Sequence, residues 1–295
     1  MAGAIPPSRL LALYLCWGAS VPAMKVMVET IPPLAGAAVV FLAGAGIVGT
    51  LAGGRRGATG AQLRRAALIG LLLLGGQGMA TVALTDLSAS LTAILTASNV
   101  LWAAVFARFA GIAMDRATIL RLVLGFAGII VVVLSAPGAA IGGSPLAIAA
   151  ALGSSVLWGL GSVVAAHGGA LPRDPLVTGT VQLLAGGLLL LLLAAAAGEL
   201  APAAWGDASA PSAGAAVFLL AFDSLAGFLL YTSLLRDTPL GLVGTYAYVV
   251  PLIAVALGVL ALGDHVSAGA ALGAAVAMAA VTAQLRAAAP ATAPR

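Results

Sequence analysis

Charged side chains are scarce in this 295-residue chain. Asp, Glu, Lys and Arg together make up 7% of the residues, whereas ordinary soluble proteins carry about 25%. Hydrophobic residues make up 62%, and the mean hydropathy is +1.15. So little charge excludes a water-soluble globular protein, and the length leaves no room for a sizeable soluble domain beside the apolar segments. We therefore expect the chain to lie in a lipid bilayer.

Other absences narrow the function. A Walker-type Gly-Lys-Ser/Thr sequence is missing, which argues against ATP as the energy source within this chain. The two histidines, His167 and His265, have no metal-spaced partner, and no Ser-His or Cys-His nucleophile arrangement is present. The single cysteine, Cys16, cannot form a disulfide within the chain. We expect no enzyme activity, no cofactor and no metal site.

The expected partners are the lipid bilayer and a small-molecule substrate. The net charge of +4 comes from basic residues that lie between apolar segments instead of along one face, which argues against nucleic acid. Nothing in the sequence indicates an obligate protein partner.

Apolar runs of membrane-spanning length fill the chain. A hydrocarbon core of roughly 30 Å takes about 20 helical residues per crossing. Continuous apolar stretches, such as residues 183–197, argue against the alternating pattern of a membrane β-barrel. Breaking the chain at Pro, Gly and charge clusters predicts an all-α integral membrane protein with ten transmembrane helices. These lie at residues 10–30, 34–53, 66–84, 88–110, 118–136, 146–166, 176–197, 213–235, 240–262 and 267–285.

The basic residues predict the orientation. Cytoplasmic loops of membrane proteins are enriched in Lys and Arg, so the arginine-rich connection at residues 53–65 should face the cytoplasm. Counting helices from that connection predicts cytoplasmic N- and C-termini and puts every Lys and Arg on the same side except Lys25, which lies within the first helix, while His265 falls in an outer connection. The outer connections instead carry acids: Glu29, Asp86, Glu199, Asp207 and Asp264. We expect a multi-pass protein of the inner (plasma) membrane.

The two halves of the chain resemble each other. A Trp-Gly step occurs in the first and sixth segments, at Trp17 and Trp158, and a Gly-rich helix closes each half. Five helices is an odd number, so the second copy must enter the membrane from the opposite side. Inverted repeats of this kind are typical of secondary transporters, with the substrate site near the midplane between the copies. The pattern predicts two inverted five-helix repeats, residues 1–138 and 139–295, around a central cavity.

These features resemble the EamA-type members of the drug/metabolite transporter superfamily, which are built as two inverted five-helix halves. Within that superfamily the chain is similar to the YddG aromatic amino-acid exporters. Their fourth helix carries an Asn-aromatic-Leu-Trp-Pro run, where residues 99–103 here read Asn-Val-Leu-Trp-Ala. Their ninth helix has Tyr-x-x-Pro, as do Tyr248 and Pro251, and their third tends to have tyrosine where this chain has Gln77.

Two ionisable residues fall inside the predicted helices. Asp223 lies near the middle of the eighth, where an unpaired charge would cost at least roughly 2.5–3.5 kcal/mol. It could attract a substrate amino group or exchange a proton, or it could be a protonated carboxyl bonded to a neighbour such as Ser224. Lys25 could extend outward towards Glu29, or it could pair with Asp223 or with a substrate carboxylate.

Polar and aromatic side chains mark the predicted cavity. In the fourth helix, Ser88, Thr92, Leu95, Asn99 and Trp102 recur at three- and four-residue spacing, which predicts one face lining the cavity. In the ninth, Tyr246 is favoured by the repeat and Tyr248 by the motif, and two residues so spaced cannot share a helical face. Trp17, Trp158 and Gln77 could instead serve helix packing. The predicted substrate-binding residues are Trp17, Gln77, Asn99, Trp102, Trp158, Asp223, Tyr246 and Tyr248.

The sequence thus predicts a secondary or facilitative transporter that exports small organic solutes by alternating access. Amino acids, with aromatic or apolar ones preferred, are the expected cargo. The alternatives are an EamA-type carrier of another metabolite or drug, and a channel, for which no repeated polar ring or carbonyl filter is seen.

Overall fold

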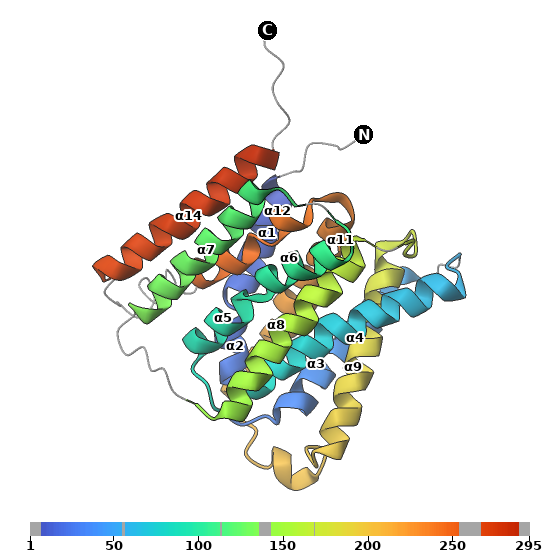
Figure 1. Cartoon of the computed structure of the whole chain (residues 1–295). Helices are drawn as coiled ribbons and strands as arrows, with labels where there is room; N and C mark the ends of the chain where they lie inside the picture. Colours follow the sequence, from blue (N-terminus) through green and yellow to red (C-terminus); the bar gives the residue numbers. More distant parts are fainter. Residues whose placement is uncertain are drawn as a thin grey trace.

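The computed structural model describes residues 7–54, 57–112, 114–135, 143–167, 169–253 and 267–288, and these residues form helices and connections with no strand among them. The helices, shown in Figure 1, are α1 (Pro7–Gly18), α2 (Ser20–Met27), α3 (Pro33–Ala52), α4 (Gly60–Ala83), α5 (Ala89–Ala97), α6 (Asn99–Phe109), α7 (Arg116–Leu134), α8 (Pro145–Ala166), α9 (Pro175–Ala196), η1 (Pro202–Trp205), α10 (Ala210–Phe218), η2 (Leu219–Phe228), α11 (Leu229–Asp237), α12 (Leu240–Val243) and α14 (Ala268–Ala288). A further helical stretch covers residues 246–253. The all-helical fold predicted from composition is confirmed.

Eight helical segments of the described chain are long and apolar enough to cross a membrane. They are Ser8–Met27, Pro33–Ala52, Gly60–Ala83, Leu91–Phe109, Pro145–Ala166, Pro175–Ala196, Ala210–Asp237 and Ala268–Ala287. The predicted fifth helix corresponds to α7, and the predicted ninth begins as the shorter apolar segment Leu240–Ile253, with the rest of it outside the described residues. The expected break between the repeats, at residue 138, also lies outside them. Ten crossings therefore stay a prediction.

Helices of the first half pack along helices of the second. α3 lies along α9, α4 lies against both α8 and α9, and α7 lies along α14 (Figure 1). Glycine allows the closest of these approaches: a Cβ added to Gly128 would lie 2.7 Å from the backbone nitrogen of Ala277, and one added to Gly273 would lie 2.6 Å from the carbonyl oxygen of Gly128. Small residues let helices approach in this way in membrane proteins.

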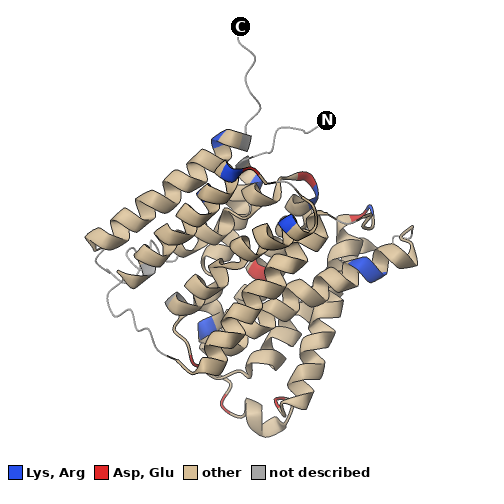
Figure 2. Cartoon of the chain, in the orientation of Figure 1, with Lys and Arg blue, Asp and Glu red and all other residues tan. Residues whose placement is uncertain are grey.

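The basic residues gather mostly at one end of the bundle, while acids lie at both ends. We call the end where α1 begins and α14 ends the terminal end, and the opposite end the far end. Figure 2 shows most Lys and Arg near the terminal end. There Arg9 donates to the Ser233 hydroxyl (2.6 Å), and Arg121 donates to the Gln284 side chain (3.1 Å). At the far end the Glu199 carboxylate accepts from the backbone N–H of Ala35.

The gathering of Lys and Arg at one end agrees with the prediction that the arginines lie on one side of the membrane. Which side of the cell that end faces stays a prediction. Arg55, Arg56, Asp264, His265 and Arg295 lie outside the described residues. At the far end, outside the spans, hydrogen bonds from the side chain and from the backbone N–H of Ser144 to the Asp86 carboxylate lower the pKa of Asp86.

Several helices predicted as continuous are interrupted near the middle of the bundle. The first breaks at Ala19 because the ring of Pro22 cannot fit against the carbonyl of Gly18, four residues earlier. The fourth breaks at Ser98, between α5 and α6, and the ninth at Gly244 and Thr245. The eighth widens into the π-helix η2. Broken helices at mid-membrane, and π-bulges, are common at functional sites.

Candidate functional site

A cavity of about 110 Å³ lies between the two halves of the chain. Every interruption described above contributes to its wall: Ser20 beside the α1–α2 break, Asn99 beside the α5–α6 break, Tyr246 after α12, and Asp223 in η2. Helices α1, α2, α4, α5 and α6 of the first half line it, together with α8, η2 and the helical stretch 246–253 of the second. The expectation of a central cavity between the repeats therefore agrees with the geometry.

The structure brings together most of the predicted site residues. Those that line the cavity are Trp17, Gln77, Asn99, Trp158, Asp223 and Tyr246. Trp102, Tyr248 and Lys25 are not among its lining residues.

Trp102 lies on another face than predicted. The three- and four-residue spacing assumed one straight helix, but the break at Ser98 changes the register between α5 and α6. Thr92 and Asn99 face the cavity as expected, whereas Leu95 packs beside buried alanines of α8. Trp102 is 38% exposed and its ring stacks on that of Phe106, 6.2 Å away. The structure thus separates Trp102 from the cavity.

The two tyrosines of the ninth segment face different ways, and Tyr246 faces the cavity. Its hydroxyl oxygen accepts a hydrogen bond from the side-chain nitrogen of Asn99, 3.0 Å away. Tyr248 is 1% exposed and its hydroxyl donates to the carbonyl oxygen of Leu122 in α7 (2.7 Å). Its ring packs on Gly125, where a Cβ would lie 2.6 Å from the ring. Tyr248 thereby joins α7 to the bundle, and the motif-based choice of Tyr248 does not fit the cavity.

Asp223 is buried, with 5% of its surface exposed, and it is bonded to a neutral side chain. The side-chain nitrogen of Gln77 donates to its Oδ2 at 2.5 Å, and Ser20 also hydrogen-bonds this carboxyl. Ser224, the neighbour expected to bond it, lies near Gly44 of α3, and its hydroxyl has no protein partner. Gln77 thus has both predicted roles: it lines the cavity, and its hydrogen bond to Asp223 joins α4 to η2.

Lys25 does not pair with Asp223. Its ammonium group donates to the carbonyl oxygens of Leu84 (2.7 Å) and Leu87 (3.2 Å), at the C-terminal end of α4. Cations are favourable at such an end because the last carbonyls of a helix lack partners within it. Lys25 therefore holds the α4–α5 connection at the far end, and of the alternatives considered from the sequence the charge pair with Asp223 is not formed.

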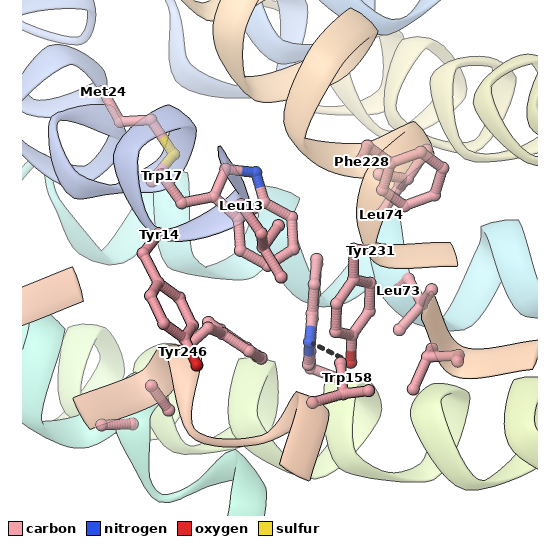
Figure 3. Packing of buried hydrophobic residues seen from close by; sticks show 14 of the residues in the cluster. Leu13, Tyr14, Trp17, Met24, Leu73, Leu74, Trp158, Phe228, Tyr231 and Tyr246 are labelled. Carbon is pink, nitrogen blue, oxygen red and sulfur yellow. Dashed lines mark hydrogen bonds between the residues drawn. The ribbon is translucent and has the colours of Figure 1, made fainter. Parts of the chain in front are cut away.

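An aromatic layer lies beside the cavity, and Figure 3 shows its four side chains close together. It consists of Trp17, Trp158, Tyr231 and Tyr246, from four separate segments of the chain. The ring centroids of Trp17 and Tyr246 lie 4.9 Å apart, and those of Tyr231 and Tyr246 lie 5.4 Å apart. The Trp158 indole nitrogen donates to the Tyr231 hydroxyl (3.1 Å), drawn as a dashed line in Figure 3. Both tryptophans therefore line the cavity and also join the two halves.

A second, smaller cavity of about 20 Å³ lies on the other side of this layer. Ser162, Tyr231 and Gly241 line it, and Asn99 and Tyr246 line both cavities. The larger cavity includes Met24 of α2, beyond Trp17 on the path to the far end. The hydrogen-bonded pair of Asn99 and Tyr246 is therefore a partition between a far-end cavity and a terminal-end cavity.

The π-helix gives the Trp17 indole a backbone acceptor. The indole nitrogen donates to the carbonyl oxygen of Asp223 at 3.3 Å. Gly227 makes room for it, because a Cβ at that position would meet the Trp17 ring and would lie 2.8 Å from the carbonyl oxygen of Phe222. The glycine, the wide turn and the tryptophan together fix where the Asp223 carboxylate lies.

Sequence reasoning missed several small polar residues of the cavity wall. Ser20, Thr96 and Ser154 line it. Ser154 precedes Trp158 by four residues and Ser20 follows Trp17 by three, so helical spacing from the two tryptophans could have found both. Within the described residues no group of three or more His, Cys, Asp or Glu side chains could hold a metal ion.

Comparison with known proteins gives consistent matches. Residues 9–134 and residues 145–285 each match the EamA-like transporter family. The uncharacterized inner membrane transporter YedA of Escherichia coli (strain K12) is 34% identical over 254 residues, which are 84% of this chain and 80% of YedA. YedA of Escherichia coli O157:H7 gives the same values. A protein of known crystal structure, 21% identical, has a TM-score of 0.74 over 95% of this chain and 96% of its own, and so shares the fold.

Proposed function

The chain belongs to the EamA-like transporter family, and from this premise we propose that it is a secondary or facilitative carrier that exports amino acids, with aromatic or apolar ones preferred. The family makes the chain a membrane transporter, which implies a small-molecule substrate and a lipid environment. The direction of transport and the amino-acid cargo are parts of the proposal.

The observation that carries the proposal is the position of the larger cavity. It lies between the two family matches, and its wall is made where helices of both halves are interrupted. Carriers with inverted repeats bind their substrates at this place, where broken helices leave polar groups available at the membrane midplane.

The chemistry of the wall supports an amino-acid substrate. The Asp223 carboxylate can hold an ammonium group, and the rings of Trp17, Trp158 and Tyr246 offer flat surfaces for an aromatic or apolar side chain. The cavity of about 110 Å³ is smaller than an engineered apolar cavity of about 150 Å³ that takes benzene, so an aromatic substrate must widen it on binding.

The partition supports alternating access. The far-end and terminal-end cavities meet at Asn99 and Tyr246, one residue from each half, so a movement of the halves that separates this pair would join the cavities. In the present state the larger cavity lies on the far-end side of the aromatic layer. With cytoplasmic termini, as the arginines predict, the far end is the extracellular side.

Uptake of radiolabelled phenylalanine into liposomes that contain the purified protein tests this function. We expect saturable uptake that Asn99→Ala lowers severalfold, because it removes one side of the partition and opens a gap in the wall. Phe109→Ala on the exposed face of α6, where Phe109 is 83% exposed, is the matched control and should leave uptake unchanged. If the protein takes up other metabolites saturably but no amino acid, the proposed amino-acid cargo is wrong and the carrier function stands. Uptake that rises linearly with concentration would indicate a channel.

A further inference from the structure

The larger cavity carries one acid and no base. Asp223 is its one ionisable carboxylate, and no Lys, Arg or His is among the described residues that line it. Lys25 of α2 does not line the cavity and is bonded to carbonyl oxygens at the end of α4. A buried carboxylate without a countercharge is unfavourable. A bound cation would supply that countercharge and so lower the free-energy cost of burying Asp223.

A second observation lies on α5. Thr92 is a lining residue of the same cavity and is 1% exposed, and its buried hydroxyl has no hydrogen-bond partner in the protein. Buried hydroxyls are almost always bonded, so an unpartnered one in a cavity wall points to a ligand group. A threonine hydroxyl can accept a hydrogen bond from an ammonium N–H.

The described residues of the wall offer only neutral donors to a ligand carboxylate. The Asn99 side-chain nitrogen donates to Tyr246, the Trp17 indole to the backbone of Asp223, and the Trp158 indole to Tyr231. A ligand carboxylate would therefore meet the Asp223 carboxylate with no cation among the described lining residues to compensate. Such an uncompensated buried charge is costly.

We propose that the cavity is a site for organic ammonium ions, with the ammonium between the Asp223 carboxylate and the Thr92 hydroxyl and an aromatic or apolar body against Trp17 and Tyr246. The carboxylate of an amino acid contributes nothing to binding here, so an amine that lacks it binds at least as tightly. This inference names the substrate class of the proposed transport site and so rests on the proposed function.

Three probes with the same ring separate the charged groups: phenethylamine has only the ammonium, 3-phenylpropionate only the carboxylate, and phenylalanine both. Binding to the purified protein is measured by calorimetry at pH 7. We expect phenethylamine to bind as tightly as phenylalanine or more tightly, and 3-phenylpropionate to bind at least about tenfold more weakly, as for loss of a hydrogen bond to a charged group. Equal binding of 3-phenylpropionate and phenethylamine would overturn the proposal.

Variants assign the site. Asp223→Asn keeps the size of the side chain and should weaken phenethylamine binding more than about tenfold, and Thr92→Val should weaken it about tenfold. Asp223→Glu restores the charge and should recover part of the affinity, which a merely structural role of Asp223 would not predict. Phe109→Ala is the control. Unchanged phenethylamine binding by Asp223→Asn would contradict the proposal.

The outcomes also separate this inference from the proposed function. If the protein transports phenylalanine but the three probes do not bind in the predicted order of affinity, the ammonium site is wrong and the amino-acid carrier function stands. If phenethylamine binds but no amino acid is transported, the proposed amino-acid cargo is wrong and the ammonium site stands. No binding of any of the three probes overturns both.

Discussion

The side-chain nitrogen of Asn99 lies 3.0 Å from the hydroxyl oxygen of Tyr246, and this hydrogen bond joins the two halves of the chain between two cavities. Asn99 opens α6 directly after the break at Ser98, and Tyr246 opens the helical stretch that follows the turn at Gly244 and Thr245. The pair thus sits where both fourth helices of the repeats are broken. Such positions can move without disrupting the rest of a helix.

Tyr246→Phe tests this partition. The change keeps the ring and removes the hydroxyl, so it should weaken the closed state by about 1 kcal/mol and raise the population of the open state about fivefold. A cysteine placed in the terminal-end cavity by Ala104→Cys, in a Cys16→Ala background, should then react several times faster with a membrane-impermeant thiol reagent. The same cysteine in a Phe109→Ala protein is the control, and equal rates in both would contradict the partition.

The two tryptophans of the first half, Trp17 and Trp102, should contribute unequally to the site. Trp17→Phe removes the hydrogen bond to the Asp223 carbonyl and reshapes the aromatic layer, so it should raise the KM of transport roughly fivefold. Trp102→Phe, outside the cavity, should change the KM less than about twofold. Concentration-dependent uptake measures both. A larger rise in KM for Trp102→Phe than for Trp17→Phe would indicate that Trp102 lines the cavity, as the spacing of the fourth helix predicts.

Gly227→Ala tests the coupling between the π-helix and Trp17. A Cβ at Gly227 would collide with the Trp17 indole and crowd the Phe222 carbonyl, and overpacking of this kind costs about 1–3 kcal/mol. We expect a lower unfolding temperature and a marked loss of transport. Gly214→Ala on α10 is the matched control, because a Cβ there meets nothing within 4 Å. Equal behaviour of the two variants would refute the coupling.

Gly128→Leu tests the seam between α7 and α14. Its side chain would enter the backbone of α14 near Ala277 and Gly273 and should separate the helices, at a cost of about 1–3 kcal/mol. Gly46→Leu on α3 is the control, since that position has open space. The unfolding temperature should fall for Gly128→Leu alone, and an equal fall for Gly46→Leu would speak against a specific seam.

The helical fold and its family were predictable from the sequence because they follow from properties that act over whole segments. Apolar runs of about 20 residues indicate membrane helices whatever their packing. The repeated Trp-Gly steps at Trp17 and Trp158 indicated the two-repeat fold, and the match of both halves to the EamA-like family confirms the resemblance. Both tryptophans line the cavity because they occupy related places in the repeats.

The faces of the broken helices were not predictable in this way. Spacing arguments assume a regular helix, and the break at Ser98 turns Trp102 away from the face that carries Thr92. Which of Tyr246 and Tyr248 faces the cavity depends on how the ninth segment packs against α7, and Tyr248 is the one that contacts α7. The sequence of the ninth segment alone does not determine this packing. The bond between Gln77 and Asp223 joins residues 146 positions apart, and no local pattern reports such a contact.

Exchange between the two sides of the membrane tests the central claim most directly. Liposomes that contain the protein are loaded with unlabelled phenylalanine, and uptake of external labelled phenylalanine is compared with that into empty liposomes. A carrier that alternates around the Asn99–Tyr246 partition should accumulate label transiently and faster in the loaded liposomes. Equal uptake in both, rising linearly with external concentration, would contradict the account.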